Sequence, residues 1–316
     1  MATPMAVASM ALVPSYLFIV EGSIVFIFNT VLALIILLTP KFVKHKEYVL
    51  LAINVVFDAL FGLAYLLGGI FQRRLMDTVE FINPTSRWNC YIMAHNQIFI
   101  IITPAMGLLI LANVIDRYIL VSRPGKYYKL TAKYPLMLLL IIAICCAPTT
   151  IAAFIEAFTS TQGPTELGIC VLQGAISRRI QIIIRSIRIL TSLLAAVFYM
   201  PILCNVRAML RNPASVGNNN KKQLKLTVTI ALITVSQLAL FTVPDLLILI
   251  TASTNFVFFV MNLNKGIINM FLIVFSQKDI RKQIFSWGKG STISFISKVN
   301  GEAAVQSSRN TFPAVK

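Results

Sequence analysis

Seven long apolar segments constrain the fold of this 316-residue chain more than any other feature. A helix needs about 20 mostly apolar residues to cross the hydrocarbon core of a bilayer, which is about 30 Å thick. Segments of this kind lie at 16–39, 48–71, 91–115, 134–157, 180–205, 226–251 and 256–275. Each is predicted to be a helix, because an open strand would leave its backbone groups unpaired in lipid. The sequence therefore predicts an all-α membrane protein built as a seven-transmembrane helix bundle.

Composition agrees with this class and argues against others. Hydrophobic residues make up 57% of the chain and charged residues 12%, which is far from the mix of a soluble domain. The net charge is +17, but the basic residues fall between the apolar segments and not on one polar face, so no nucleic-acid partner is expected. Five cysteines, at spacings that match no zinc or haem pattern, predict at most one disulfide and no metal. We expect no cofactor and no enzymatic activity.

The distribution of Lys and Arg predicts the orientation of the bundle in the membrane. Alternate connections, together with the carboxyl-terminal tail, carry twenty of these residues, and the remaining connections carry five. Because cytoplasmic segments are enriched in positive charge, the amino terminus is predicted to lie outside. The predicted organisation is a short extracellular amino terminus at 1–15, the seven-helix domain at 16–275, a membrane-surface helix at 276–287 and a disordered cytoplasmic tail at 288–316.

The membrane-surface helix is predicted from the segment SQKDIRKQIFSW. It places Ile280, Ile284, Phe285 and Trp287 near one helical face, and its lysine and arginine side chains are available to lipid headgroups. Such a segment is typical of a short amphipathic helix that lies on the inner leaflet. The residues after it are rich in Ser, Gly and Lys, and we expect them to be disordered.

A polar tripeptide ends the third apolar segment at its cytoplasmic side. Asp116, Arg117 and Tyr118 are followed by Pro124 and Tyr127, and this pattern resembles the DRYxxxxxPxxY signature of rhodopsin-like G-protein-coupled receptors. The other reading is an interfacial ion pair without a signalling role. The resemblance implies a multi-pass receptor of the plasma membrane, surrounded by the lipid bilayer, that binds an extracellular ligand and activates a heterotrimeric G protein.

Further positions extend the resemblance over about residues 15–287. Asn29 and Asp58 stand where the family carries a polar pair in its first two helices, and the resemblance implies a disulfide between Cys90 and Cys170. Cys90 and Arg117 are 27 residues apart, which is about two more than the family pattern. We therefore expect the top of the third helix to be unwound.

The later helices keep some of the family's switch residues and lose others. The resemblance gives Tyr199 the role of the fifth-helix tyrosine that approaches the arginine on activation, and gives Asn269 the role of the asparagine in the seventh-helix NPxxY motif. No acidic residue stands near Leu224 to pair with Arg117. The family's tryptophan, proline and tyrosine are replaced by Thr242, Met270 and Ile273. Such departures, with the short amino terminus, resemble the divergent chemoreceptor families of nematodes.

Several ionisable residues lie within the apolar segments, where an unpaired charge is costly. Glu21 and Arg185 are placed so that they can snorkel to the outer interface. Asp58 and Lys265 lie too deep in their segments to snorkel in this way. The alignment through Asn269 places Lys265 one turn above Asn269, facing Asp58. We expect the Lys265 ammonium to form an internal salt bridge there, in place of the sodium ion that the resemblance implies at this aspartate. A lysine in the seventh helix also raises the alternative of a retinal-binding opsin. By the same alignment, however, the position of the retinal-binding lysine in opsins corresponds to Leu263 in this chain.

The ligand pocket is predicted at the outer ends of the third, fifth and sixth helices. Asp245 follows the sixth-helix proline, and Arg188 reaches the same region from the fifth helix. Either they contact a charged ligand, or they pair with each other and only shape the cavity. Asn96, Gln97 and Phe99 are expected to line the side formed by the third helix.

The predicted function is that of a G-protein-coupled receptor for an extracellular ligand, either a chemosensory small molecule or a peptide. Two alternatives stay open from the sequence. A secondary transporter would usually show repeats and paired broken helices, and this chain shows no visible repeat. An orphan receptor that does not couple is suggested by the altered switch positions.

Overall fold

The computed structural model of the chain describes residues 4–78, 85–123, 125, 127, 129–130, 133–160, 170–211, 218–251 and 256–288. Seven helices in this part are long and apolar enough to cross a membrane, which confirms the predicted seven-helix fold. The membrane-spanning helices are α1 (Pro4–Leu38), α3 (Lys46–Thr78), α5 (Ala94–Ser122), α7 (Tyr134–Thr159), α9 (Arg178–Arg211), the continuous run of α10 (Asn218–Gln237), η3 (Leu238–Thr242) and α11 (Val243–Thr251), and α12 (Phe256–Ser276). The described parts of the connections contain the short helices α2 (Pro40–Val43), α4 (Arg87–Tyr91) and α8 (Leu172–Ala175).

The chain divides into two compact units, residues 1–276 and 277–316. The second unit contains α13 (Lys278–Gly288), and the predicted membrane-surface helix therefore forms as a helix. Its place on the inner leaflet stays a prediction. Pro124 of the signature and residues 289–316 of the predicted tail lie outside the described residues.

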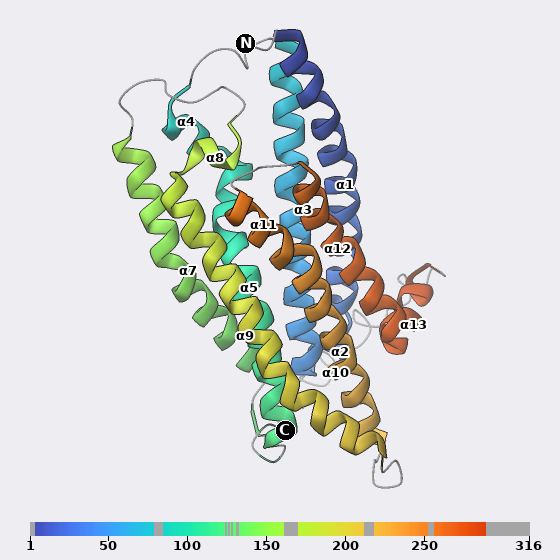
Figure 1. Cartoon of the computed structure of the whole chain (residues 1–316). Coiled ribbons are helices and arrows are strands. Elements are labelled where there is room, and N and C mark those ends of the chain that lie inside the picture. The colour runs from blue at the N-terminus through green and yellow to red at the C-terminus, as the bar shows by residue number, and fades with distance from the viewer. Residues whose placement is uncertain are drawn as a thin grey trace, which may run out of the picture. The chain divides into compact units, whose positions relative to one another are not determined.

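Within the first unit, neighbouring helices pack in an order that closes the bundle (Figure 1). Helix α3 packs between α1 and α5, α5 also contacts α7 and α9, and α12 packs against α1 and α10. One buried apolar cluster among the described residues is central and includes Val25, Phe61, Met106, Phe241 and Leu263. Five helices thus contribute to one core, and many of their other apolar side chains face outward, as expected of a protein surrounded by lipid.

Helices α1 and α3 approach so closely that only glycine fits between them. A Cβ atom added at Gly22 would lie 2.7 Å from the backbone nitrogen of Leu66, and one added at Gly62 would lie 2.8 Å from the backbone nitrogen of Phe26. Small residues at such crossings let the helix backbones touch, and this is how transmembrane helices gain packing energy in the absence of a hydrophobic driving force. The pair therefore forms a tightly packed side of the bundle.

The third and sixth spans depart from regular α-helix at their outer parts. Helix α5 begins at Ala94, and Cys90 belongs to the separate short helix α4, whose first turn is capped by the Ser86 hydroxyl. This break accounts for the two extra residues before Arg117. In the sixth span the π-helical segment η3 ends two residues before Pro244, which cannot donate a backbone hydrogen bond. π-Helical segments are frequent at functional sites.

Candidate functional site

At the inner end of α5, the Arg117 guanidinium is held by neighbours from its own helix and from the following connection. Its Nη2 lies 2.5 Å and its Nε 2.9 Å from Asp116 Oδ2, and Nη2 also donates to the Tyr127 hydroxyl at 3.3 Å. The Tyr127 hydroxyl lies 3.3 Å from the same Asp116 oxygen. Arg117 and Asp116 are each 1% exposed, so this charge pair is shielded from solvent. The structure therefore brings two of the predicted switch residues together, with Tyr127 as a third member.

Tyr127 is itself fixed by the start of α3. The Lys46 ammonium donates to the Tyr127 carbonyl and lies 3.6 Å from the centre of its ring. Burial raises the pKa of Tyr127, so its hydroxyl stays protonated at physiological pH and remains able to donate. Tyr118, the third residue of the tripeptide, instead turns outward, is 38% exposed and packs beside Phe198.

The inner half of the sixth span is tied to its neighbours by side-chain hydrogen bonds. The Tyr199 hydroxyl on α9 donates to the backbone carbonyl of Thr227 on α10. The Thr229 hydroxyl donates to the Ser276 hydroxyl at the end of α12, at 2.8 Å. Tyr199 thus contacts α10, and it lies near enough to Arg117 for an electrostatic interaction.

A buried polar cluster lies at mid-height between α3 and α12. The Lys265 ammonium donates to Asp58 Oδ1 at 2.6 Å, and Asn269 Nδ2 donates to Asp58 Oδ2 at 3.0 Å. The side chains of Lys265 and Asp58 are 5% and 2% exposed. Asn29 on α1 completes the cluster by donating to the Val25 carbonyl and to the Gly266 carbonyl. Both oxygens of the Asp58 carboxylate are therefore satisfied by protein groups.

The Phe241 ring connects this polar cluster with the outer part of the bundle. Phe241 is fully buried in η3, and Lys265 Nζ lies 5.2 Å from the centre of its ring. The Arg188 guanidinium carbon lies 4.4 Å from the same ring centre. Both distances fall within the range of cation–π attraction. One aromatic side chain of the sixth span thus contacts two cations from two other helices.

A cavity of about 300 Å³ opens above Phe241 at the outer ends of the helices. The Cys90–Cys170 disulfide, which the family resemblance implied, lies between α4 and the segment before α8. Asn96 Nδ2 donates to the carbonyl of Cys90 at 2.8 Å and to that of Cys170 at 3.0 Å. A ring nitrogen of His95 lies 3.2 Å from the Cys170 carbonyl. These contacts fix the outer connection beside the cavity, and both His95 and Asn96 line it.

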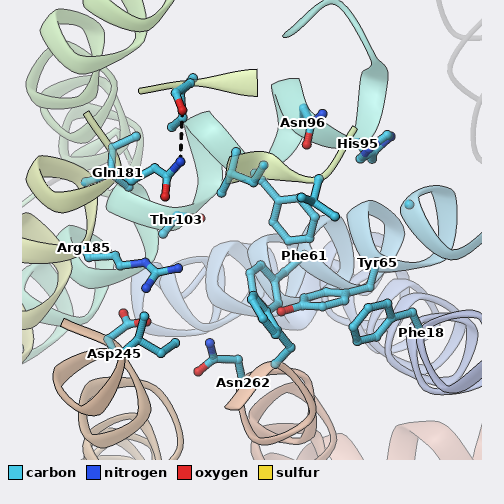
Figure 2. A pocket seen from close by; sticks show the side chains of 18 of the residues that line it. Phe18, Phe61, Tyr65, His95, Asn96, Thr103, Gln181, Arg185, Asp245 and Asn262 are labelled. Carbon is cyan, nitrogen blue, oxygen red and sulfur yellow. Dashed lines mark hydrogen bonds between the residues drawn. The ribbon is translucent and has the colours of Figure 1, made fainter. Parts of the chain in front are cut away.

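The charged wall of the cavity comes from α9 and α11 (Figure 2). Arg188 and Asp245 form a direct ion pair, with their side chains 4% and 1% exposed. Gly107 on α5 allows α9 to approach, because a Cβ atom at this position would lie 3.0 Å from the Arg188 Cα. The structure thus shows the two predicted pocket residues paired with each other. A contact between either of them and a ligand stays a prediction.

Two predicted side-chain placements differ from the structure. Gln97 does not line the cavity, because its amide donates to the Tyr91 carbonyl at 2.6 Å. Arg185 was expected to snorkel outward, yet its side chain lines the cavity (Figure 2). In both cases the outcome depends on the rotation of the helix about its axis, which the residue spacing alone does not determine. Phe99 lines the cavity as predicted.

The aromatic wall opposite the charges is not predictable from the sequence. Phe61, Tyr65 and Phe99 meet edge to face, with ring centres 4.9–5.6 Å apart. Phe18 packs against Tyr65 at 5.1 Å, and Phe259 lies beyond Phe18. All five residues line the cavity. Aromatic residues are common in any apolar span, so their number gave no signal of a shared wall.

The fold and the site together define a serpentine receptor. It has seven spanning helices, a polar cluster at mid-height, an outer cavity anchored by a disulfide, and a buried Asp-Arg pair at the inner end. A family model described as the serpentine type 7TM GPCR chemoreceptor Srsx matches residues 23–286. The chain belongs to this family of nematode chemoreceptors, and it is a multi-pass protein of the plasma membrane. No curated protein matches the chain. The family match supports the receptor prediction over a transporter or an opsin.

Proposed function

We propose that a ligand bound in the outer cavity activates a heterotrimeric G protein at the inner surface around Arg117. The observation that carries the proposal is the Asp116–Arg117–Tyr127 cluster. A buried guanidinium at the mouth of the bundle, held by a few hydrogen bonds, supplies a group that a partner can engage once those bonds open. Binding a ligand and engaging a G protein require no chemistry, only a difference in affinity between two conformations.

The sixth span supplies a physical connection between the two ends. Its outer part carries Asp245 at the cavity, η3 carries Phe241 against two cations, and its inner part carries Thr227, which accepts a hydrogen bond from Tyr199. A ligand that shifts Asp245 therefore acts on the helix whose inner half must move. Outward movement of that half would break the Tyr199–Thr227 contact and free Tyr199 to approach Arg117.

Two hydrogen bonds at the inner half of the sixth span are weak enough for a ligand to overcome. The Tyr199–Thr227 and Thr229–Ser276 hydrogen bonds contribute about 0.5–1.5 kcal/mol each, or about 1–3 kcal/mol together. A ligand supplies that free energy if it binds the active conformation about 5- to 150-fold more tightly than the inactive one. This preference is ordinary for allosteric ligands.

Guanine-nucleotide exchange tests the proposal directly. Membranes that contain the receptor are incubated with a panel of Gα subunits and pooled small molecules, and nucleotide binding is measured. We expect at least one pool to stimulate exchange, and Arg117→Ala to abolish the response. Arg123→Ala is the matched control, because Arg123 is an exposed arginine six residues later and its loss should leave exchange intact.

Two outcomes would count against G-protein coupling. Equal exchange by wild type and Arg117→Ala, at equal amounts of folded receptor at the cell surface, would remove Arg117 from the mechanism. Absence of exchange with every Gα subunit, for a compound shown separately to bind, would favour a receptor that does not couple. Phe241→Leu tests the connection through the sixth span: we expect binding to remain and exchange to fall.

A further inference from the structure

The charges that line the cavity do not balance. Among the residues that the structure describes, three charged residues line it: Arg185, Arg188 and Asp245. The last two form a direct ion pair. Glu21 on α1 does not line the cavity. The described part of the lining therefore carries one positive charge in excess of its negative charge, and Arg185 is the residue outside the pair.

The Arg185 guanidinium has N–H donors available for a ligand. Among the residues that the structure describes, its guanidinium forms no hydrogen bond and no ion pair of its own, although it lies near enough to Asp245 to be attracted. It projects from α9 into the cavity, one turn before Arg188 (Figure 2). A guanidinium carries five N–H donors in a planar fork that matches a carboxylate in a bidentate way. A charge within a spanning segment is costly without a partner, so this group is expected to serve a ligand.

A second, independent observation marks the cavity as a binding site. Asn262 on α12 is 4% exposed and lines the cavity, and its Oδ1 atom accepts no hydrogen bond among the described residues. A buried amide oxygen without a donor is unfavourable and is commonly satisfied by a water molecule or a ligand. Asn262 lies between the charged wall and the aromatic wall in Figure 2.

We infer that the cavity binds a small amphipathic monocarboxylate, with its carboxylate on Arg185 and its apolar body against Phe61, Tyr65 and Phe99. The inference deepens the proposed function, because it takes this cavity as the site of the activating ligand. A single surplus positive charge matches a monoanion, whereas a phosphate dianion would exceed it. A cationic ligand is disfavoured, because Asp245 already pairs with Arg188. The volume of about 300 Å³ is at the lower end of ligand pockets, and it favours a small molecule over a peptide.

The test measures binding apart from signalling. Thermal unfolding of the purified full-length receptor is followed with acetate, butyrate, hexanoate, phenylacetate and 3-phenylpropionate, each beside its uncharged primary amide. We expect one of the two aryl acids or hexanoate to stabilise the wild type in a saturable way, while the amide binds about 10- to 100-fold more weakly. Methylphosphonate and phenyl phosphate distinguish a carboxylate site from a general anion site.

Variants of α9 locate the carboxylate contact. Arg185→Gln should weaken binding of the stabilising acid about 10- to 100-fold, and Arg185→Lys should lose less, because it keeps the charge without the planar fork. Arg178→Gln removes an exposed arginine from the start of the same helix and should leave affinity unchanged. The inference is overturned if amides bind as well as acids, if no acid stabilises the protein, or if Arg185→Gln keeps wild-type affinity. Should Arg185→Gln fail to fold, Arg185→Lys and the acid–amide comparison on wild type decide the matter.

Nucleotide exchange with the same compounds separates this inference from the proposed function. Saturable, Arg185-dependent binding of an acid without exchange supports the carboxylate site and contradicts G-protein coupling by that ligand. If only uncharged or cationic compounds stimulate nucleotide exchange, this result supports G-protein coupling and overturns the carboxylate site. The two proposals therefore fail in different ways.

Discussion

Substitution of Lys265 by methionine removes the ammonium that lies 2.6 Å from Asp58 in the middle of the bundle. Both side chains are at most 5% exposed, so the carboxylate that remains cannot regain water. Breaking a buried ion pair by removal of one partner costs about 3–5 kcal/mol, because it leaves an uncompensated buried charge. Asn269 still donates one hydrogen bond to Asp58, which places the expected loss near the lower limit, at about 3 kcal/mol.

The reverse change and the double change complete a thermodynamic cycle. Asp58→Asn leaves the Lys265 ammonium without its carboxylate, and we expect a similar loss of about 3 kcal/mol. The double variant contains no buried charge at this point, and its stability should lie within about 1 kcal/mol of wild type. The coupling energy is then about 5 kcal/mol, which falls in the range measured for close charge pairs.

Thermal unfolding of the purified receptor, in one detergent and at one pH, measures the cycle. For a chain of 316 residues, a loss of 3 kcal/mol corresponds to a fall of about 4–5 °C in Tm for each single variant, and the double variant should recover most of it. The Cys204→Ser change, at an exposed position of α9, controls for the handling of variants. If the losses of the two single variants simply add in the double variant, the two side chains do not compensate each other and the reasoning is refuted.

The same pair predicts how the receptor responds to sodium. Because Lys265 occupies the place next to the Asp58 carboxylate, exchange of sodium for choline at constant ionic strength should leave the affinity of any bound ligand unchanged. A clear dependence of wild-type affinity on sodium would contradict the assignment of Lys265 as a replacement for the ion.

Three other substitutions have expected outcomes. Tyr127→Phe removes the hydroxyl that contacts the inner charge pair, so basal nucleotide exchange should rise about 2- to 10-fold at unchanged surface expression; unchanged or lower basal exchange would argue against a restraining role. Gly62→Val places a Cβ 2.8 Å from the Phe26 backbone nitrogen and should lower stability by about 1–3 kcal/mol in thermal unfolding; a neutral result would mean that α1 and α3 can separate at no cost. Cys170→Ser opens the disulfide that joins residues 80 positions apart and should lower stability by about 2–5 kcal/mol, whereas Cys204→Ser should be neutral.

The sequence predicted those features that depend on composition along the chain or on helical spacing. The seven spans follow from the length of the apolar segments, and all seven occur. The Asp58–Lys265 contact followed from the family resemblance, because alignment through Asn269 put Lys265 one turn before it on the face of the helix toward Asp58. Where the position of a side chain depends on its own helix and on a known neighbour, sequence reasoning is sufficient.

Features that depend on the rotation of a helix could not be predicted. Arg185 is compatible with an outward or an inward direction, and the packing of α9 on Gly107 of α5 selects the inward one. The π-helical segment before Pro244 has no short-range signature other than the proline itself. The cavity wall combines rings from α1, α3, α5 and α12, and its existence follows only from the assembled bundle.

The contact between the backbones of α1 and α3 also determines where the bundle is able to deform. At Gly22 and Gly62 no side chain separates the two helices, so neither can rotate or slide without a direct collision of main-chain atoms. The opposite side is held differently, since α9 and α12 are joined to α10 through individual side-chain hydrogen bonds. The molecule therefore has one stationary edge and one compliant edge. Pairs of spectroscopic labels on α1 and α3 would serve as an internal ruler of fixed length, against which displacement of α10 can be read.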